Sequence, residues 1–112
     1  MVDERAERRQ ADKLRAISQK QKTDIDDAVA ALVQHPQGRQ YIYWLLEICG
    51  IGRNPYTPNA LNTSFACGQL NVGQQIQAHL IEVAPQAFLD MLKEKEEERL
   101  NALRSNDTDS AD

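Results

Sequence analysis

Four side chains in this 112-residue chain are of the types that most often carry catalysis or bind metals. They are His35, Cys49, Cys67 and His79. Zinc sites usually contain ligands in close pairs, whereas these four are separated by 14, 18 and 12 residues. No Ser/His/Asp or Cys/His motif with a recognisable local signature surrounds them. We therefore predict no enzyme activity, no catalytic residue, no metal site and no cofactor.

Three aspartates, Asp24, Asp26 and Asp27, form the other cluster of metal-ligand types. They lack the glycine and the final glutamate of a calcium-binding loop. Carboxylates are favourable at the positively polarised start of a helix. The cluster therefore predicts a helix that begins at Thr23 or Asp24, rather than a cation site.

Composition excludes several classes of protein. No apolar run approaches the roughly 18 to 20 residues of a membrane-spanning helix, and the start of the sequence lacks the pattern of a signal peptide. We expect synthesis in the cytosol, where two cysteines behave as small apolar side chains rather than as a disulfide framework. With 112 residues, the chain is long enough for one small domain.

Charge is distributed unevenly along the chain, whose formal net charge is −4. Residues 1–22 carry seven basic and four acidic side chains, so this segment is +3. Residues 61–112 carry four basic and nine acidic side chains, so that segment is −5. No charged residue lies between Arg53 and Glu82. Because uncharged, amide-rich segments often face other proteins, we predict a protein interface at Gln69, Asn71, Gln74, Gln75 and Gln77. The alternative is that these amides form an ordinary helix face in contact with water.

The pattern of apolar residues and helix-capping residues predicts an all-α fold. We expect a small bundle of about four to five helices with extended polar helical arms at both ends. A basic arm over residues 1–22, ordered on a partner, precedes a helical core over residues 23–92. A charged helical extension over residues 93–104 and a disordered tail over residues 105–112 follow.

Proline and glycine set most of the predicted helix boundaries within the core. One helix stops before Pro36, because the residue before a proline avoids the helical region. The next begins between Pro36 and Gly38 and runs to about Cys49, where Gly50 suits the cap. After a loop, a helix from Asn62 or Thr63 to about Ala84 is followed by one that begins at Pro85.

The large apolar residues of these helices are the predicted core. We expect Gly68 and Gly73 to permit close backbone contact, because glycine inside a helix otherwise costs about 1 kcal/mol relative to alanine. The aromatic and leucine residues expected to anchor the core are Tyr41, Trp44, Leu45, Phe65 and Phe88. For Tyr41 and Trp44 the alternative is a contact with another protein.

An alternative hypothesis assigns nucleic-acid binding to the chain. Basic side chains of the arm can contact phosphates without sequence preference. The turn Gly50-Ile51-Gly52 is similar to the hairpin of helix-hairpin-helix motifs, in which backbone amides contact phosphate. The candidate phosphate contacts are Arg5, Arg8, Arg9 and Arg53.

The stretch from His35 to Met91 resembles a family of small virion structural proteins of short-tailed (podovirus-type) bacteriophages. At Gln40 and Leu70 this sequence departs from the family, which often has basic residues at these two positions. The resemblance therefore implies no ion pair at either position. The resemblance is carried by Pro36-x-Gly38-Arg39, Trp44-Leu45-Leu46-x-x-Cys49-Gly50-Ile51, Asn59, Asn62-Thr63-x-Phe65-x-x-Gly68, Asn71-Val72-Gly73 and Pro85-x-x-Phe88-x-x-Met91-Leu92.

The resemblance implies a non-enzymatic part of a phage particle. Its position would be the internal portal-associated assembly that is ejected with the DNA, or a connector. The implied partners are other virion proteins, namely portal, internal or connector proteins, and self-association stays open. The implied location is the virion, with the host cytoplasm during assembly. The alternative is a small DNA-binding or host-modulating phage protein that uses the basic arm.

Overall fold

The structure describes residues 3–110, with side chains up to residue 106. Most of these residues are helical. In this computed structural model the described residues form four helices and no strand. The predicted all-α fold of four to five helices is confirmed. The helices are α1 (Glu4–Val33), α2 (Pro36–Ile48), α3 (Ala60–Val83) and α4 (Pro85–Ser110).

The first helix, α1, is one continuous rod of 30 residues. Its N-cap is Asp3, whose carboxylate accepts a hydrogen bond from the Arg5 amide at 3.0 Å. The hydroxyl of Thr23 donates to the carbonyl of Gln19, as it does inside a helix. The predicted helix start at Thr23 or Asp24 is therefore wrong, because no residue there breaks the helix that comes before.

The predicted boundaries of α2 are confirmed. Pro36 occupies the first turn, where its missing N–H costs nothing. Cys49 is the C-cap, and Gly50 follows with a φ of +86° that favours glycine. Gly52 has a φ of +84°, which completes the turn out of the helix.

The third helix begins earlier than the sequence indicated. Asn59 is its N-cap, and its side chain accepts hydrogen bonds from the amides of Leu61 and Asn62. The hydroxyl of Thr63, predicted as a cap, instead bonds to Thr57 and closes the preceding loop. The predicted start at Asn62 or Thr63 is therefore too late, because the asparagine next to Pro58 caps the helix first.

The last helix, α4, begins at Pro85 as predicted. It continues without a break through the charged segment to Ser110. The structure is thus helical over residues 105–110, where the sequence predicted disorder. The last two residues of that predicted tail lie outside the described part of the chain.

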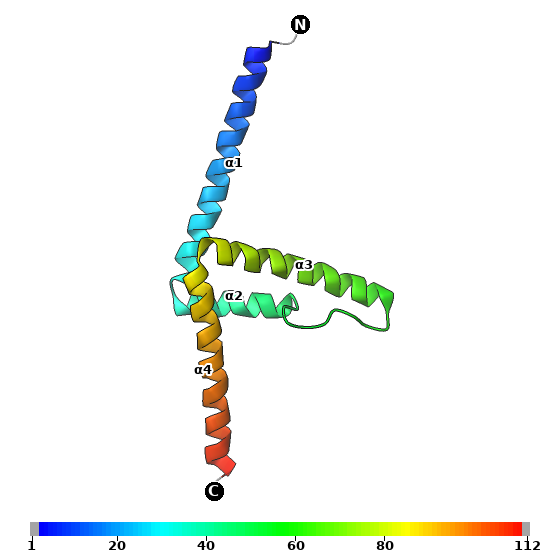
Figure 1. Cartoon of the computed structure of the whole chain (residues 1–112), viewed down its shortest axis with the longest axis vertical. Coiled ribbons are helices and arrows are strands. Elements are labelled where there is room, and N and C mark those ends of the chain that lie inside the picture. The colour runs from blue at the N-terminus through cyan, green and yellow to red at the C-terminus, as the bar shows by residue number, and fades with distance from the viewer. Residues whose placement is uncertain (1–2, 111–112) are drawn as a thin grey trace.

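The helices form a flat, elongated arrangement in which α4 crosses α2 at a central junction (Figure 1). Helices α2 and α3 lie side by side and extend to one side of the junction, while α1 and α4 leave it in opposite directions. The molecule measures 86 × 40 × 15 Å along its principal axes. Its radius of gyration is 21.2 Å, against about 13 Å for a compact domain of this length.

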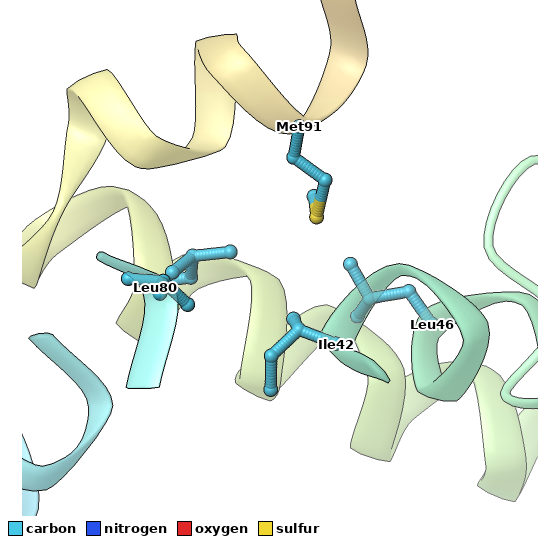
Figure 2. Close-up of a cluster of buried hydrophobic side chains, with 5 residues drawn as sticks. Ile42, Leu46, Leu80 and Met91 are labelled. Atoms are coloured by element: carbon cyan, nitrogen blue, oxygen red, sulfur yellow. The ribbon is translucent and has the colours of Figure 1, made fainter. Parts of the chain in front are cut away.

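The core is a small apolar cluster where the four helices meet, as Figure 2 shows for most of its members. Each helix contributes to it, and partly buried residues such as Val29, Ile76 and Phe88 pack around it. Because each helix has neighbours on only one side, only one face of each is buried. The buried apolar side chains are Val33, Ile42, Leu46, Leu80 and Met91.

Three of the five predicted core anchors are on the surface. Tyr41 is 54% exposed, Trp44 53% and Phe65 69%. Successive residues of a helix are rotated by about 100°, so Trp44 lies on the opposite side of α2 from Ile42. The core assignment of these three residues is wrong, because Tyr41 and Trp44 lie off the buried face of α2 and Phe65 lies near the start of α3, away from the junction. The contact alternative for Tyr41 and Trp44 stays a prediction. Phe88 does pack against the core, and Leu45 is half-buried.

Glycine allows two close approaches between elements. A Cβ atom at Gly73 would lie 2.6 Å from the Cβ of Cys49, so this glycine lets α3 approach the end of α2 as predicted. A Cβ at Gly38 would collide with the backbone carbonyl of Leu32, so α2 passes directly over α1. The prediction for Gly68 is wrong, since no atom would lie within 4 Å of its Cβ.

Candidate interaction surfaces

A charged cluster joins α1 to α3. Nε2 of His79 lies 2.6 Å from Oδ1 of Asp26, and Nζ of Lys22 lies 3.1 Å from Oδ2 of the same carboxylate. Lys22 also lies 3.5 Å from Glu82. The hydrogen bonds from His79 and Lys22 hold the pKa of Asp26 below its ordinary value. The hydrogen bond to Asp26 raises the pKa of Lys22. The cluster therefore acts as a clamp between two helices.

The other residues of metal-binding type are dispersed. His35 is the N-cap residue of α2, Cys49 is half-buried against Gly73, and Cys67 is exposed on α3. Within residues 3–110 no group of three or more His, Cys, Asp or Glu side chains could hold a metal ion.

A second ion pair joins α2 to α4. Nε and Nη2 of Arg39 lie 2.8 and 2.5 Å from Oε1 of Glu94. Nη1 of Arg39 donates to the carbonyls of Val33 and Gln34, which satisfies the end of α1. The hydrogen bond to Glu94 raises the pKa of Arg39, whose side chain is 12% exposed. Sequence reasoning missed this pair because Glu94 lies in a run of charged residues.

The five predicted amides do not form one surface. Asn71 and Gln75 are one turn apart on α3, with Nε2 of Gln75 3.5 Å from Oδ1 of Asn71. Gln69 instead lines a cavity beside Cys49, and Gln77 is half-buried. Gln74 is exposed. Because helical residues advance by about 100°, these five positions spread around α3 rather than along one stripe.

The predicted phosphate contacts are also far apart. Arg5, Arg8 and Arg9 are exposed near the free end of α1, and Nε of Arg9 donates to the carbonyl of Arg5. Arg53 lies beyond the other end of α2, where its guanidinium donates to the carbonyl of Glu47. The N-terminal end of α1 and the loop after α2 lie on different sides of the molecule (Figure 1).

The turn after α2 caps the helix. The amide of Gly50 donates to the carbonyl of Glu47, and the amide of Ile51 donates to the carbonyl of Leu46. No helix starts within the turn, because α3 begins only at Ala60. The helix start that contacts phosphate in a helix-hairpin-helix motif is therefore missing at this turn.

The most extensive feature of the surface is its apolar side chains. On α2 the rings of Tyr41 and Trp44 lie 5.9 Å apart, and Ile48 is exposed one turn further along. The sequence left the core and a contact open for Tyr41 and Trp44, and it did not indicate that the other large apolar residues are exposed. The large exposed apolar residues elsewhere are Leu14, Ile17, Ile25, Leu32, Tyr56, Leu61, Phe65, Val72, Ile81, Leu89, Leu92, Leu100 and Leu103.

None of the helices in residues 3–110 combines the length and the apolar character required to cross a membrane. Comparisons with protein-family models, with curated proteins and with solved structures found no match. The interpretation of the surfaces therefore depends on their chemistry and on the resemblance described above.

Proposed function

We propose that this protein is a non-enzymatic structural subunit of a larger protein assembly. The observation that carries the proposal is the ratio of exposed to buried apolar side chains. Sixteen large apolar side chains are exposed among the described residues, while five apolar side chains are buried. Soluble monomers rarely expose contiguous apolar patches larger than a few hundred Å². A subunit inside an assembly covers such surfaces with its neighbours.

The shape of the molecule supports the same proposal. The molecule is flat and elongated, and its five buried apolar side chains all lie where the helices meet, so most of its area encloses no core. The first arm is exposed along residues 4–21, and isolated helices are marginal in water. Neighbouring subunits cover these exposed faces.

The proposed setting is the virion of a short-tailed phage, in the internal portal-associated assembly or a connector. Its support is the resemblance carried by the stretch from His35 to Met91, and several residues of that stretch have structural roles here. Gly38 and Gly73 permit close helix approach, Arg39 joins α2 to α4, and Asn59 caps α3. A pattern made of such residues is typical of a shared packing unit rather than of a shared active site.

Quantitative mass spectrometry of gradient-purified particles tests this proposal. The particles come from the phage that encodes the chain, and the measured quantity is the number of copies per portal subunit. We expect a fixed ratio, and we expect particles made without the protein to be defective or unstable. Normal, infectious particles that lack the protein, together with its accumulation in infected cells, would contradict the proposal.

DNA binding by the basic arm is a second candidate. It is favoured by one observation, which is that residues 3–21 are exposed throughout and include six basic and four acidic side chains. A triple substitution of Arg5, Arg8 and Arg9 with glutamine should then abolish a salt-sensitive gel shift of duplex DNA. The absence of any shift at low salt would exclude this candidate.

A further inference from the structure

Helix α4 carries all of its exposed large apolar side chains on one side. Leu89 is 55% exposed, Leu92 45%, Leu100 37% and Leu103 48%, and no other large apolar side chain in the described part of α4 is exposed. At about 100° per residue, these leucines and Glu96 fall within about a quarter of the helix circumference. We call the four leucines together with Glu96 the leucine stripe.

The leucine stripe lies on the opposite side of α4 from the junction. Met91, which is 2% exposed, and Glu94, which is bonded to Arg39, face the junction. Leu100 is nine residues after Met91, and nine steps of about 100° amount to about two and a half turns. A second helix packed on the stripe therefore has α4 between itself and the buried core.

The spacing of the stripe is the same when the helix is followed in either direction. From Leu89 to Leu103 the steps are three, four, four and three residues, with Glu96 at the centre. When two copies of α4 pack antiparallel about Glu96, each leucine therefore lies at the same height along the helices as a leucine of the other copy. Leu89 is level with Leu103, and Leu92 is level with Leu100. A two-fold axis through the centre forms each of these pairs twice.

We propose that two copies of this chain form a symmetric dimer in which their α4 helices pack antiparallel through the leucine stripe. This inference rests on the proposed structural function and names a second copy as the partner that covers α4. The stripe pairs with itself, as a two-fold interface requires. Its length from Leu89 to Leu103 is about 21 Å, at about 1.5 Å per residue, so the interface is small.

Charges beside the stripe favour the same arrangement. In a two-fold antiparallel pair, an edge of one helix meets the same edge of the other, and charged residues there set partner and orientation. Lys93 and Glu97 are exposed on one edge. Lys93 of each copy comes within two residues of the level of Glu97 of the other copy. Two pairs of opposite charge therefore join the copies along this edge.

Glu96 and Arg99 make the centre of the pair electrically balanced. Within one helix, Nη2 of Arg99 lies 2.6 Å from Oε1 of Glu96. In the dimer the two Glu96 carboxylates meet at the axis, and each Arg99 lies within three residues of the level of the other copy's Glu96. Lys95, on the same edge as Arg99, has partners in its own chain. Its Nζ lies 4.9 Å from the centre of the Tyr43 ring and 3.2 Å from Glu98.

The paired segments as a whole carry almost no net charge. Residues 86–106 contain four basic and five acidic side chains, for a net charge of −1. Two copies of this segment therefore repel each other little, although the whole chain has a net charge of −4. The second copy is thus compatible with α4 in its apolar spacing, its edge charges and its total charge.

Two single-charge variants of the full chain give the sharpest test. Lys93→Glu places glutamates opposite each other in both edge pairs, and Glu97→Lys places lysines opposite each other. Each variant alone should dimerise roughly tenfold more weakly than the wild type. A 1:1 mixture of the two restores both opposite-charge pairs and should dimerise about as well as the wild type. Repulsion between positions 93 and 97 within one helix remains in the mixture, so recovery there reports on the contact between copies.

Sedimentation velocity measures these dissociation constants. Concentrations from about 10 μM to about 1 mM cover the range expected of so small an interface. Added salt should weaken the wild-type dimer, because the edge charges are exposed. It should also reduce the difference between each charge variant and the wild type.

A double variant tests the leucine stripe. Leu100→Asp with Leu103→Asp changes one member of every leucine pair, and both residues lie on the part of α4 beyond the junction. We expect no dimer at concentrations where the wild type dimerises. The control is Asn101→Asp with Ser105→Asp, which adds the same charges at exposed positions on the other side of α4. The control should dimerise as the wild type does, and circular dichroism should show the same helix content in both.

Disulfide formation tests the antiparallel orientation. In a background with Cys49→Ala and Cys67→Ala, one sample carries Leu89→Cys and another carries Leu103→Cys. Mild oxidation of the 1:1 mixture should link the two kinds of chain, because the two positions are level in the dimer. Either sample alone should stay unlinked, because its own two cysteines are about 21 Å apart along the helices.

Four outcomes would overturn the antiparallel dimer. They are a wild type that stays monomeric up to about 1 mM, a charge-variant mixture that dimerises no better than its components, a leucine double variant that dimerises as well as its control, and disulfide links within either cysteine sample alone. None of them affects the measurement of copies per particle, which tests the structural function on its own. Particles that contain the protein together with a monomeric wild type would mean that α4 binds another virion protein.

Discussion

The junction and the arms are built from the same kind of helix but are held in different ways. At the junction, five apolar side chains are buried, and Arg39 and Asp26 each join two helices. Along residues 4–21 and 96–106 the side chains are exposed, and ion pairs such as Arg15–Asp12 and Arg99–Glu96 link positions within one helix. Helix content therefore does not indicate where the stability of this chain resides.

Because of this difference, substitutions at the junction and in the arms should affect different properties. Changes at the junction remove packing that no other part of the molecule replaces, so they should lower the free energy of unfolding. Changes in the arms leave the folded junction unaltered and should act on association instead. The following predictions test this contrast, starting with the largest effect.

Leu80→Ala should lower the free energy of unfolding more than any other substitution considered below. Leu80 is 2% exposed and lies in the core cluster with Ile42 and Met91. Replacing a buried leucine with alanine costs about 2–5 kcal/mol, as lost burial plus a cavity. Urea denaturation monitored by circular dichroism measures the loss. A change below about 1 kcal/mol, close to the scale of surface substitutions, would mean that the junction is not the source of stability.

Gly73→Ala and Gly68→Ala should have opposite signs. A Cβ at Gly73 would meet Cys49 at 2.6 Å, so the substitution should lower the free energy of unfolding by about 1–3 kcal/mol. At Gly68 nothing lies within 4 Å, and alanine should raise helix stability by about 0.5–1 kcal/mol. Thermal melts of the two variants check both signs. Equal shifts would show that α3 does not approach α2 closely.

Trp44→Ala should lower the free energy of unfolding only slightly, although the side chain is large. Trp44 is 53% exposed, and its aromatic neighbour is Tyr41. We expect the loss of that ring pair to lower the free energy of unfolding by about 0.5–1.5 kcal/mol. Urea denaturation measures this value. A loss comparable to that of Leu80→Ala would place the tryptophan in the folding core rather than on a contact surface.

Asp26→Asn should change the pH dependence of stability. The folded-state pKa of Asp26 is lowered, first by the hydrogen bond from His79 and then by that from Lys22. The carboxylate therefore stabilises the fold above its unfolded pKa of about 4. This contribution is lost as pH falls through the lowered folded pKa.

Melting temperatures at pH 6 and in steps below about pH 4 compare the wild type with Asp26→Asn. We expect the wild type to melt higher at pH 6 and the difference to shrink as the solution becomes more acidic. Asp24→Asn is the matched control, because Asp24 is exposed on the same helix. A constant difference across this range would contradict the clamp between α1 and α3.

Leu14→Ala should have the smallest effect on folding. Leu14 is 60% exposed on the basic arm, and such surface substitutions change stability by about 0.5 kcal/mol or less. Thermal melts at low protein concentration isolate folding from association. A large loss there would show that the arm packs within its own chain.

Much of the fold follows from local signals that act over a few residues. Pro36 and Pro85 begin helices as predicted, because a proline at the first position needs no amide partner. Gly50 ends α2 because its φ of +86° suits glycine. These signals gave the wrong start for α3, where more than one residue could have been the N-cap. Asn59 rather than Thr63 caps α3, since a side-chain contact with Thr57 takes up the threonine hydroxyl.

The interaction surfaces were less predictable. The amide set from Gln69 to Gln77 was selected by composition, and the structure spreads it around α3. The aromatic pair of Tyr41 and Trp44 was expected either in the core or at a contact, and the structure exposes it. Burial of a helix face depends on how many neighbours the helix has, and the sequence of one helix does not state that number.

The sequence by itself determined that the chain is helical, where α2 and α4 begin, and that its two ends carry opposite charge. These features depend on residue type and near neighbours. Only the tertiary structure decided that the four helices form a flat, extended arrangement, which faces are buried, and that the charged arms point in opposite directions. The physical reason is that such properties arise from contacts between residues far apart in the chain, such as Arg39 with Glu94 and Asp26 with His79.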